Sequence, residues 1–433
     1  MSTALRPSAC PGLLRIVQAL DGGICRIKLN GGSISASQAE AVASAAERFA
    51  GGVIEATNRA NLQIRGIGSE QTALIDSLLA AGLGPRTAAG DDVRNLMLSP
   101  AAGIDRHRLF DTRPLAEQIL ATLQSHERFH ELSAKFAVQL DGGEALAMLE
   151  HPHDLWLSAA EREGERLLAF GLAGCPTDTP AGSVTLEQGH ALVVAVLELF
   201  LDLARPDQTR MRHVLAEIPV AEFLARLAER VPLNPITDWR RSLSPDALHI
   251  GVHPQAGTEY VYIGAIPPLG RLDPVMLRGA AQLAREFGDG SLRFTPWQSL
   301  LLPTVGKERA PEVIRRLEQL GLLCEPDQPL SRLIACTGSA GCGKGLADTK
   351  SDALQLAALL QRHDQTVHLS GCQRSCAAAH GVPVTLLAVA PGRYDLYFRD
   401  AGQSGFGALH ARNLTIEAVG GLLDARPRSS LDA

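Results

Sequence analysis

The chain has 433 residues, of which 45% are hydrophobic and 20% charged, and its formal net charge is −6. This size and balance fit a soluble protein of several domains, and the acidic excess argues against a general nucleic-acid binder. No stretch approaches the roughly 18 apolar residues of a membrane span, and the start, MSTALRPSACPG, lacks the apolar core of a secretory signal. We therefore expect a cytoplasmic protein without a nucleic acid or a membrane as partner.

Two segments repeat one pattern of strand, glycine turn, helix, glycine turn and strand. Gly32 of the first copy matches Gly270 of the second, and Thr57 matches Thr295, both at a spacing of 238 residues without a gap. The helix expected in the first copy has apolar residues at a 3.6-residue period: Ala39, Val42, Ala46 and Phe49. Chance similarity between two αβ segments is the alternative, but it would not give a gapless match over so many positions.

The repeat continues into two larger segments. The run from Arg94 matches the run from Arg332, and Val138-Gln-Leu-Asp-Gly resembles Val367-His-Leu-Ser-Gly. We predict an α+β, internally duplicated fold with pseudo-two-fold symmetry. Its expected parts are a small unit at 1–75, a large αβ domain at 76–205, a helical connector at 206–240, a second small unit at 241–310 and a second large αβ domain at 311–433.

Four of the eight cysteines form a C-x5-C and a C-x3-C pair, each after an apolar strand: Cys336, Cys342, Cys372 and Cys376. Thiolates at strand ends, separated by small residues, can hold a [4Fe–4S] cluster. Structural zinc prefers narrower C-x2-4-C spacings, and disulfides are rare in the cytosol, so these two alternatives are weaker. The other four are expected to be buried small hydrophobes: Cys10, Cys25, Cys175 and Cys324.

The first half has no cysteines at the matching positions and is instead rich in basic and amide residues at strand ends. Every second residue from Arg59 to Arg65 is polar, which should place these side chains on one strand face. Arginine forks and lysine charges suit a polycarboxylate ligand. The predicted ligand-binding residues are Arg26, Lys28, Asn58, Arg59, Gln63, Arg65, Arg94, Asn95 and Lys135. We assign no catalytic residue, and we assign no site to the histidine-containing segments 126–130 and 150–154, because such segments are more often surface patches.

These motifs resemble the sulfite and nitrite reductase family over nearly the whole chain. The resemblance rests on the T-x-R-x-x-x-Q strand, the R-N strand, the K-F strand and the four cysteines: Thr57, Arg59, Gln63, Arg94, Lys135, Cys336, Cys342, Cys372 and Cys376. It implies that the small units are ferredoxin-like half-domains, that the second large domain carries a [4Fe–4S] cluster and that the first is the tetrapyrrole-binding side. In members with siroheme, Cys376 would be the thiolate shared between the cluster and the siroheme iron.

Two positions depart from the family pattern. The family commonly has K-F-K where this chain has Ala137 in third place, and an arginine where this chain has Lys28. The departures point to a branch that hydroxylates a tetrapyrrole in cobalamin biosynthesis instead of carrying siroheme. That branch implies a monooxygenase that uses O2 to hydroxylate precorrin-3A at C20 with closure of a γ-lactone, a non-haem iron and NADH.

The electron donor and two other functions stay open at this point. No G-x-G-x-x-G dinucleotide motif follows a strand, so electrons are expected to arrive through an electron-donor protein. A siroheme-dependent sulfite or nitrite reductase is the main alternative to the hydroxylase. A non-enzymatic electron-transfer protein is a third possibility, and it leaves the basic residues of the first half unexplained.

Overall fold

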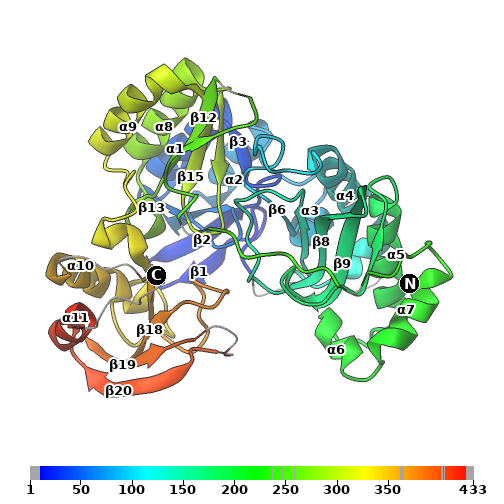
Figure 1. Cartoon of the computed structure of the whole chain (residues 1–433). Coiled ribbons are helices and arrows are strands. Elements are labelled where there is room, and N and C mark those ends of the chain that lie inside the picture. The colour runs from blue at the N-terminus through cyan, green and yellow to red at the C-terminus, as the bar shows by residue number, and fades with distance from the viewer. Residues whose placement is uncertain are drawn as a thin grey trace.

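The computed structural model describes residues 10–236, 238–245, 247–257, 259–360, 365–400, 403 and 405–425. These residues form three lobes (Figure 1). The paired lobe contains both small units, the first αβ lobe follows the first small unit, and the second αβ lobe follows the second small unit. Among the described residues, no helix is both long and apolar enough to cross a membrane.

The paired lobe consists of two five-stranded sheets covered by four helices. The first sheet has the order β1 (Val17–Ala19), β2 (Gly22–Ile27), β5 (Leu62–Ile67), β4 (Val53–Ala56) and β13 (Arg271–Leu272). The second has the order β11 (Gly251–Pro254), β12 (Tyr260–Ala265), β15 (Leu300–Gly306), β14 (Ser291–Phe294) and β3 (Ser33–Ser35). The helices are α1 (Ala36–Phe49), α2 (Gln71–Ala80), α8 (Pro274–Phe287) and α9 (Ala310–Gln319).

The duplication predicted from the sequence is confirmed. The pairs α1 and α8, β4 and β14, and β5 and β15 each begin 238 residues apart. The two copies also exchange strands: β3 of the first copy pairs with β14, and β13 of the second copy pairs with β4. As a result, both copies share one hydrophobic core, in which the small buried side chains of α1 and α8 let these helices pack together.

Each αβ lobe has a five-stranded sheet with the same topology, in which the first three strands in chain order are parallel and the last two antiparallel. The first lobe contains β6 (Leu96–Leu98), β7 (Val138–Asp141), β8 (His153–Arg162), β9 (Glu165–Gly174) and β10 (Gly182–Val184), with α3 (Ala88–Val93), α4 (Arg113–Ser125), α5 (Gly189–Leu203), α6 (Met211–Leu215) and α7 (Val220–Ala228). The second contains β16 (Leu333–Ala335), β17 (Val367–Ser370), β18 (Val384–Ala390), β19 (Arg393–Phe398) and β20 (Ala408–Leu414), with α10 (Thr349–Leu359) and α11 (Ile416–Asp424).

Short 3-10 helices join several of these elements: η1 (Glu127–Glu131), η2 (Pro268–Gly270), η3 (Lys307–Arg309), η4 (Pro329–Arg332) and η5 (Gly338–Ala340).

The observed units differ in extent from those expected. Helices α6 and α7, which lie in the segment 206–240, pack into the same core as α4 and α5, so this segment is part of the first αβ lobe. Helix α2 crosses the expected boundary at residue 75, and α9 lies almost wholly beyond 310, yet both contribute to the core of the paired lobe. Each small unit therefore extends by one helix, because that helix buries its apolar face there.

Candidate functional site

The two cysteine pairs follow neighbouring strands of the second αβ lobe. Cys336 comes directly after β16, and Cys372 lies two residues after the end of β17. These strands are parallel, so their carboxyl ends meet at one edge of the sheet. Cys336, Cys342 and Cys372 are partly buried, Cys376 is exposed, and all four are free thiols. The arrangement predicted from the sequence, with both pairs at strand ends, is therefore present.

The chemistry of this donor set fits a [4Fe–4S] cluster. The backbone N–H of Gly371 donates a hydrogen bond to the Cys336 Sγ at 3.2 Å, the kind of contact that tunes cluster potentials. The pKa of Cys376 is raised by partial burial of its thiol and then by the nearby thiols of Cys372, Cys336 and Cys342, so the four side chains lie in one neighbourhood.

A single zinc ion fits this donor set poorly. Among the described residues, no three Cys, His, Asp or Glu side chains converge closely enough to hold one metal ion. Four separate irons, each taking one thiolate, do not require that convergence, whereas one tetrahedral zinc does.

Glycines let the cysteine loops pack tightly. At Gly338, where φ is +66°, a Cβ atom would lie 2.5 Å from the carbonyl oxygen of Ala347. At Gly345, a Cβ would lie 2.5 Å from the backbone of Gly338. Both contacts are too short for any other residue, so the small residues noted in the sequence are a geometric requirement of this loop.

Residues of the first half lie beside the cysteine loop. The Asn58 side chain donates to the carbonyl oxygen of Cys376 at 3.2 Å. Arg26 on β2 pairs with Gln63 on β5, and its Nη2 donates to the Gln63 Oε1 at 2.8 Å. Burial lowers the pKa of Arg26, and the nearby thiols of Cys10 and Cys376 act against that shift. We call Arg26, Asn58, Arg59 and Gln63 the basic face.

Arg59 is the residue of the basic face that lies among other cations. Its pKa is lowered by burial and then by repulsion from Arg26 and Arg210. It lines a small pocket together with Arg94, Ala137 and His153. Neighbouring guanidinium groups repel one another, and this repulsion is relieved when an anion binds among them. The pocket is therefore suited to an anionic ligand.

Arg94 also points to an anionic ligand. Its side chain is buried, and its Nε and Nη2 atoms have no hydrogen-bond partner. The nearest carboxylate is Asp91, whose Oδ1 lies 3.6 Å from Nη2, which is an ion pair without a hydrogen bond. Buried guanidinium donors are rarely left unpaired, so Arg94 has the capacity to bind a carboxylate of a ligand.

The structure does not bring the remaining predicted residues to the basic face. Arg65 is buried and binds Asp21 through two hydrogen bonds of 2.9 Å. The Lys28 ammonium donates to the carbonyl oxygens of Asp91 and Asp92 at 2.6 and 2.9 Å, and burial lowers its pKa to about 7.

Asn95 lines the pocket of Arg59 and Arg94, although its amide nitrogen is bound to the backbone, whereas Lys135 lies elsewhere. Asn95 Nδ2 donates to three backbone carbonyl oxygens, those of Asp92, Ala134 and Phe136. Lys135 lies exposed in a turn.

Sequence reasoning missed a buried group next to Arg59. Asp154 forms a buried ion pair with Arg210 at 2.9 Å and accepts from the backbone N–H of Ala137. Burial, followed by the charge of Arg59, lowers the pKa of His153 to about 3, so its ring is neutral near pH 7. The segment 150–154 was the sequence signal for this group. Its burial could not be predicted, because it depends on Arg210, which is distant in the sequence.

The other histidine segment, 126–130, is mostly half-buried, and its Phe129 side chain is fully buried. His126 stacks on the Phe129 ring with centroids 4.2 Å apart, and a His130 ring nitrogen lies 3.1 Å from the carbonyl oxygen of Gln124. Of the scattered cysteines, Cys25 and Cys324 are buried as expected, whereas Cys10 and Cys175 are only partly buried.

Comparison with known proteins identifies both kinds of domain. The nitrite/sulfite reductase ferredoxin-like half domain matches residues 17–82 and 253–320. The nitrite and sulphite reductase 4Fe-4S domain matches residues 89–234, which form the first αβ lobe. The cysteines lie in the second αβ lobe, whose sheet has the same strand order.

Individual relatives cover most of the chain. It is 31% identical to the ferredoxin–nitrite reductase of Zea mays over 81% of its length and 67% of the relative's. It is 27% identical to a precorrin-3B synthase of Sinorhizobium sp over 92% of its length and 84% of the relative's. The structure of the NirA protein of Mycobacterium tuberculosis superposes with a TM-score of 0.77 at 21% identity, over 93% of this chain and 79% of that one. The chain spans about two thirds of the plant reductases' length, 64% for the Spinacia oleracea enzyme. It belongs to the nitrite and sulfite reductase family of oxidoreductases.

Proposed function

We propose that this protein is a precorrin-3B synthase, which uses O2 to hydroxylate precorrin-3A at C20 with closure of a γ-lactone. One observation carries the proposal, namely the absence of a second lysine from the described residues that line the pocket of Arg59 and Arg94. Ala137 lines this pocket at the position where the family pattern has a second lysine. Lys28, which stands where the pattern has an arginine, is held by two backbone carbonyl oxygens and lines a neighbouring cavity that Arg94 also borders.

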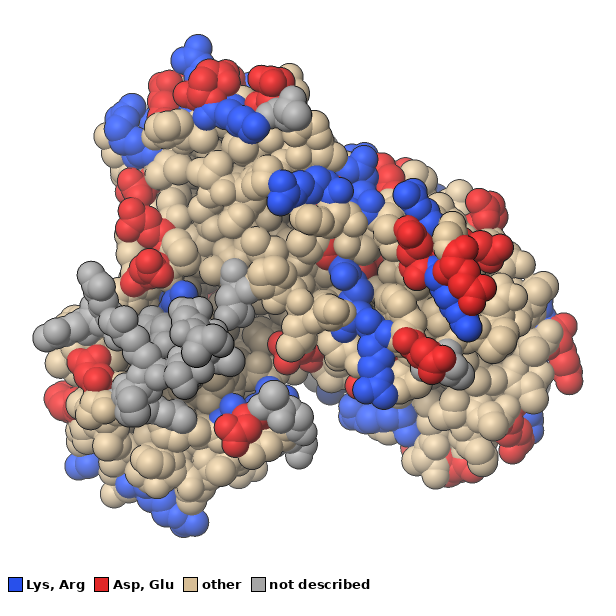
Figure 2. All heavy atoms as spheres, in the orientation of Figure 1, with Lys and Arg blue, Asp and Glu red and all other residues tan. Residues whose placement is uncertain are grey.

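The charge matters because the two reactions require different pockets. Reduction of sulfite or nitrite needs dense positive charge around a small anion while electrons and protons arrive. A tetrapyrrole with several carboxylates needs separated guanidinium groups, each of which can bind one carboxylate through two hydrogen bonds. Arg26, Arg59 and Arg94 supply three such guanidinium groups, and the second lysine of the family pattern is absent from the described residues of the pocket. Figure 2 shows a hollow between the two αβ lobes, next to the paired lobe, in which such a ligand could lie.

The residues of this chain then have distinct roles. Arg26, Arg59 and Arg94 bind substrate carboxylates, and Asn58 fixes the basic face to the cysteine loop through Cys376. The four cysteines would hold a [4Fe–4S] cluster, which would supply single electrons. Burial keeps the rings of His153 and His151 neutral beside Arg59, and the His151 Nδ1 is buried without a hydrogen-bond partner, so it is available to a polar group of the substrate.

The proposed reaction defines what else must be supplied. One oxygen atom of O2 enters the substrate and the other leaves as water, which requires two electrons and two protons. The electrons would come from NADH or from an electron-donor protein. A non-haem iron belongs to the proposal as well, but we name no ligands for it, since the described side chains offer no converging set.

A siroheme-dependent nitrite or sulfite reductase is the second candidate. It is favoured by the 31% identity to the maize nitrite reductase, whereas the precorrin-3B synthase is matched over a larger share of both chains. The hydroxylase is favoured by the absence of a second lysine from the described residues of the pocket, because a sulfite or nitrite reductase requires denser positive charge there.

The experiment that separates the two candidates combines a spectrum with isotope labelling. Protein purified without oxygen should show the broad, weak absorption of a cluster and no sharp siroheme bands. With a reductant, precorrin-3A and labelled O2, the product should gain one labelled oxygen atom, whereas labelled water should not label that atom. Stoichiometric siroheme together with appreciable nitrite or sulfite reduction would overturn the proposal in favour of the reductase.

A further inference from the structure

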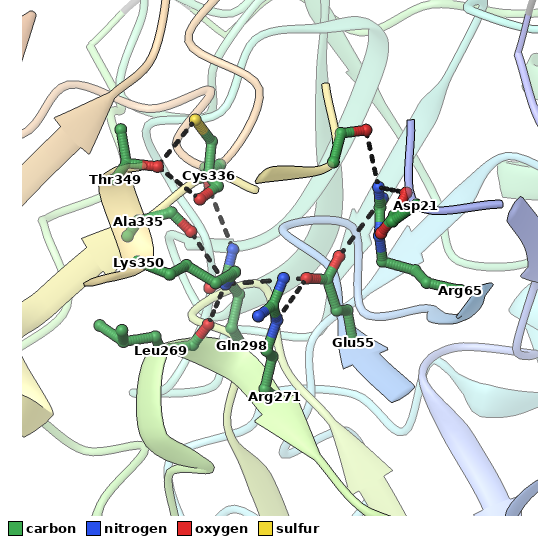
Figure 3. A network of polar contacts seen from close by, with 12 residues as sticks. Asp21, Glu55, Arg65, Leu269, Arg271, Gln298, Ala335, Cys336, Thr349 and Lys350 are labelled. Atoms are coloured by element: carbon green, nitrogen blue, oxygen red, sulfur yellow. Dashed lines mark hydrogen bonds and ion pairs between the residues drawn. The ribbon is translucent and has the colours of Figure 1, made fainter. Parts of the chain in front are cut away.

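A network of charged side chains, three of them buried, lies next to Cys336 (Figure 3). We call it the Glu55 network, and its members are Asp21, Glu55, Arg65, Arg271 and Lys350. The Glu55 carboxylate lies 3.0 Å from Arg271 Nε, 3.7 Å from Arg65 Nη1 and 3.8 Å from Lys350 Nζ. The side chains of Glu55, Arg65 and Lys350 are each at most 9% exposed. The network thus joins both small units to the second αβ lobe.

Two cations of the network hold the backbone next to the cysteines. Lys350 Nζ donates to the carbonyl oxygen of Ala335, the residue before Cys336, at 3.1 Å. Arg65 Nη2 donates to the carbonyl oxygen of Gly341, the residue before Cys342, at 3.3 Å. Each cysteine of the C-x5-C pair is therefore preceded by a carbonyl group bound to a buried cation.

The duplication supplies an internal comparison. At the 238-residue spacing, the position of Glu55 corresponds to Arg293, which donates to the carbonyl oxygens of Pro100 and Ala102 at 3.1 and 2.8 Å. Those carbonyls belong to the loop after β6, the counterpart of the Cys336 loop without cysteines. On the cysteine-free side an arginine at this position binds the loop carbonyls directly, whereas on the cysteine side the same position is an acid that gathers several cations.

The network carries a surplus of positive charge. The network has three cations and two carboxylates, which leaves one positive charge uncompensated. The same surplus remains when only its three most buried members are counted, namely Arg65, Lys350 and Glu55. Burial lowers the pKa of Lys350 to about 8 while Glu55 acts against that shift, so the amine is protonated at pH 7. Charges in this buried setting interact more strongly than charges in water.

We propose that the Glu55 network raises the reduction potential of the iron–sulfur cluster on Cys336, Cys342, Cys372 and Cys376. Reduction adds one electron, and an uncompensated positive charge next to the cysteines stabilises the more negative, reduced state. This inference rests on the cluster assignment of the proposed function, but not on its substrate. The network residues are positioning residues, because they act on the cluster through charge and through the loop backbone.

The test is a redox titration of the cluster at pH 7, followed by electron paramagnetic resonance, in native protein and charge variants. Lys350→Met should shift the midpoint to more negative potential, so that at the native midpoint the ratio of reduced to oxidised cluster falls about tenfold, or about 59 mV. Glu55→Gln should shift it in the opposite direction, and the double variant should lie near the native value. Arg271→Gln, at a partly exposed position, should give a smaller negative shift.

Iron and sulfide analysis of each variant makes the result decisive. Arg293→Met removes a buried cation from the equivalent position on the cysteine-free side, so it should keep the native potential even if it lowers stability. Equal potentials in all cluster-containing variants, or shifts of one sign for Lys350→Met and Glu55→Gln, would overturn the proposal. Loss of the cluster from every network variant but not from Arg293→Met would overturn it too, since the network would then serve assembly alone. A native protein without a cluster would refute the cluster assignment itself, whereas a cluster without hydroxylase activity would leave this inference standing.

Discussion

Arg59 and Arg65 come from one alternating row in the sequence, and the structure gives them different environments. Arg59 lies among other cations, Arg26 and Arg210, at the pocket. Arg65 is buried in ion pairs with Asp21 and Glu55. We therefore predict that Arg59→Met weakens tetrapyrrole binding without loss of stability, whereas Arg65→Met destabilises the protein.

The size of both effects follows from these contacts. Loss of one charged hydrogen bond removes roughly 1.5–3 kcal/mol, so Arg59→Met should raise the dissociation constant roughly 10- to 150-fold. It also relieves repulsion, so the unfolding temperature should stay the same or rise slightly. Breaking a buried ion pair costs about 3–5 kcal/mol, so Arg65→Met should lower the unfolding temperature and loosen the loop at Gly341.

The assay is an anaerobic titration of each variant with precorrin-3A, or with a stable polycarboxylate porphyrin, at matched iron and sulfide content. Arg162→Gln, at a surface position on the first αβ lobe, serves as the control and should bind like the native protein. Native affinity in an Arg59→Met variant that retains its cluster would refute the placement of the substrate carboxylates.

Three further predictions concern the cysteines, the pocket and acid stability. Cys336→Ser should lose most bound iron and sulfide and the broad visible absorption, whereas Cys175→Ser should keep them; full retention in Cys336→Ser would remove this residue from the site. Ala137→Lys should keep the cluster but bind tetrapyrrole more weakly, because the added side chain enters the pocket of Arg59 and Arg94; unchanged affinity would place the ligand elsewhere. Burial lowers the pKa of His368 to about 3 from an unfolded value of 6.5, so the native state loses about 1.4 kcal/mol per pH unit as the pH falls through this range. His368→Leu should therefore gain stability relative to the native protein between pH 6 and pH 4, and parallel pH profiles of the unfolding temperature would contradict this.

The sequence predicted the duplication well because a gapless repeat preserves both spacing and apolar period. Helices α1 and α8 begin at the same repeat position, as the pattern required. It could not predict the strand exchange, since β3 and β13 occupy equivalent repeat positions whichever sheet they join. That choice depends on the packing of the two copies, which no local pattern records.

The limits of the site prediction also have a physical cause. The alternating row assumed a continuous strand from residue 59, but residues 57–60 form a turn in which Ala60 has a φ of +54°, and β5 begins only at Leu62. Arg59 and Arg65 therefore cannot share one environment. The buried ion pair of Asp154 with Arg210 was hidden for a related reason, because burial of a polar segment depends on a partner distant in the chain.

The strand exchange explains why charge encoded in the first half meets cysteines encoded in the second. Asn58 and Cys376 are far apart in the sequence and hydrogen-bonded in the structure. At the position equivalent to Arg59, the second copy has Trp297, which stacks on His249 with ring centroids 5.1 Å apart. The two copies have therefore diverged at this position: Arg59 lines the pocket, whereas Trp297 packs against a small apolar cluster that includes Tyr262 and Leu301. On the proposed function, only the first copy contributes a guanidinium group here.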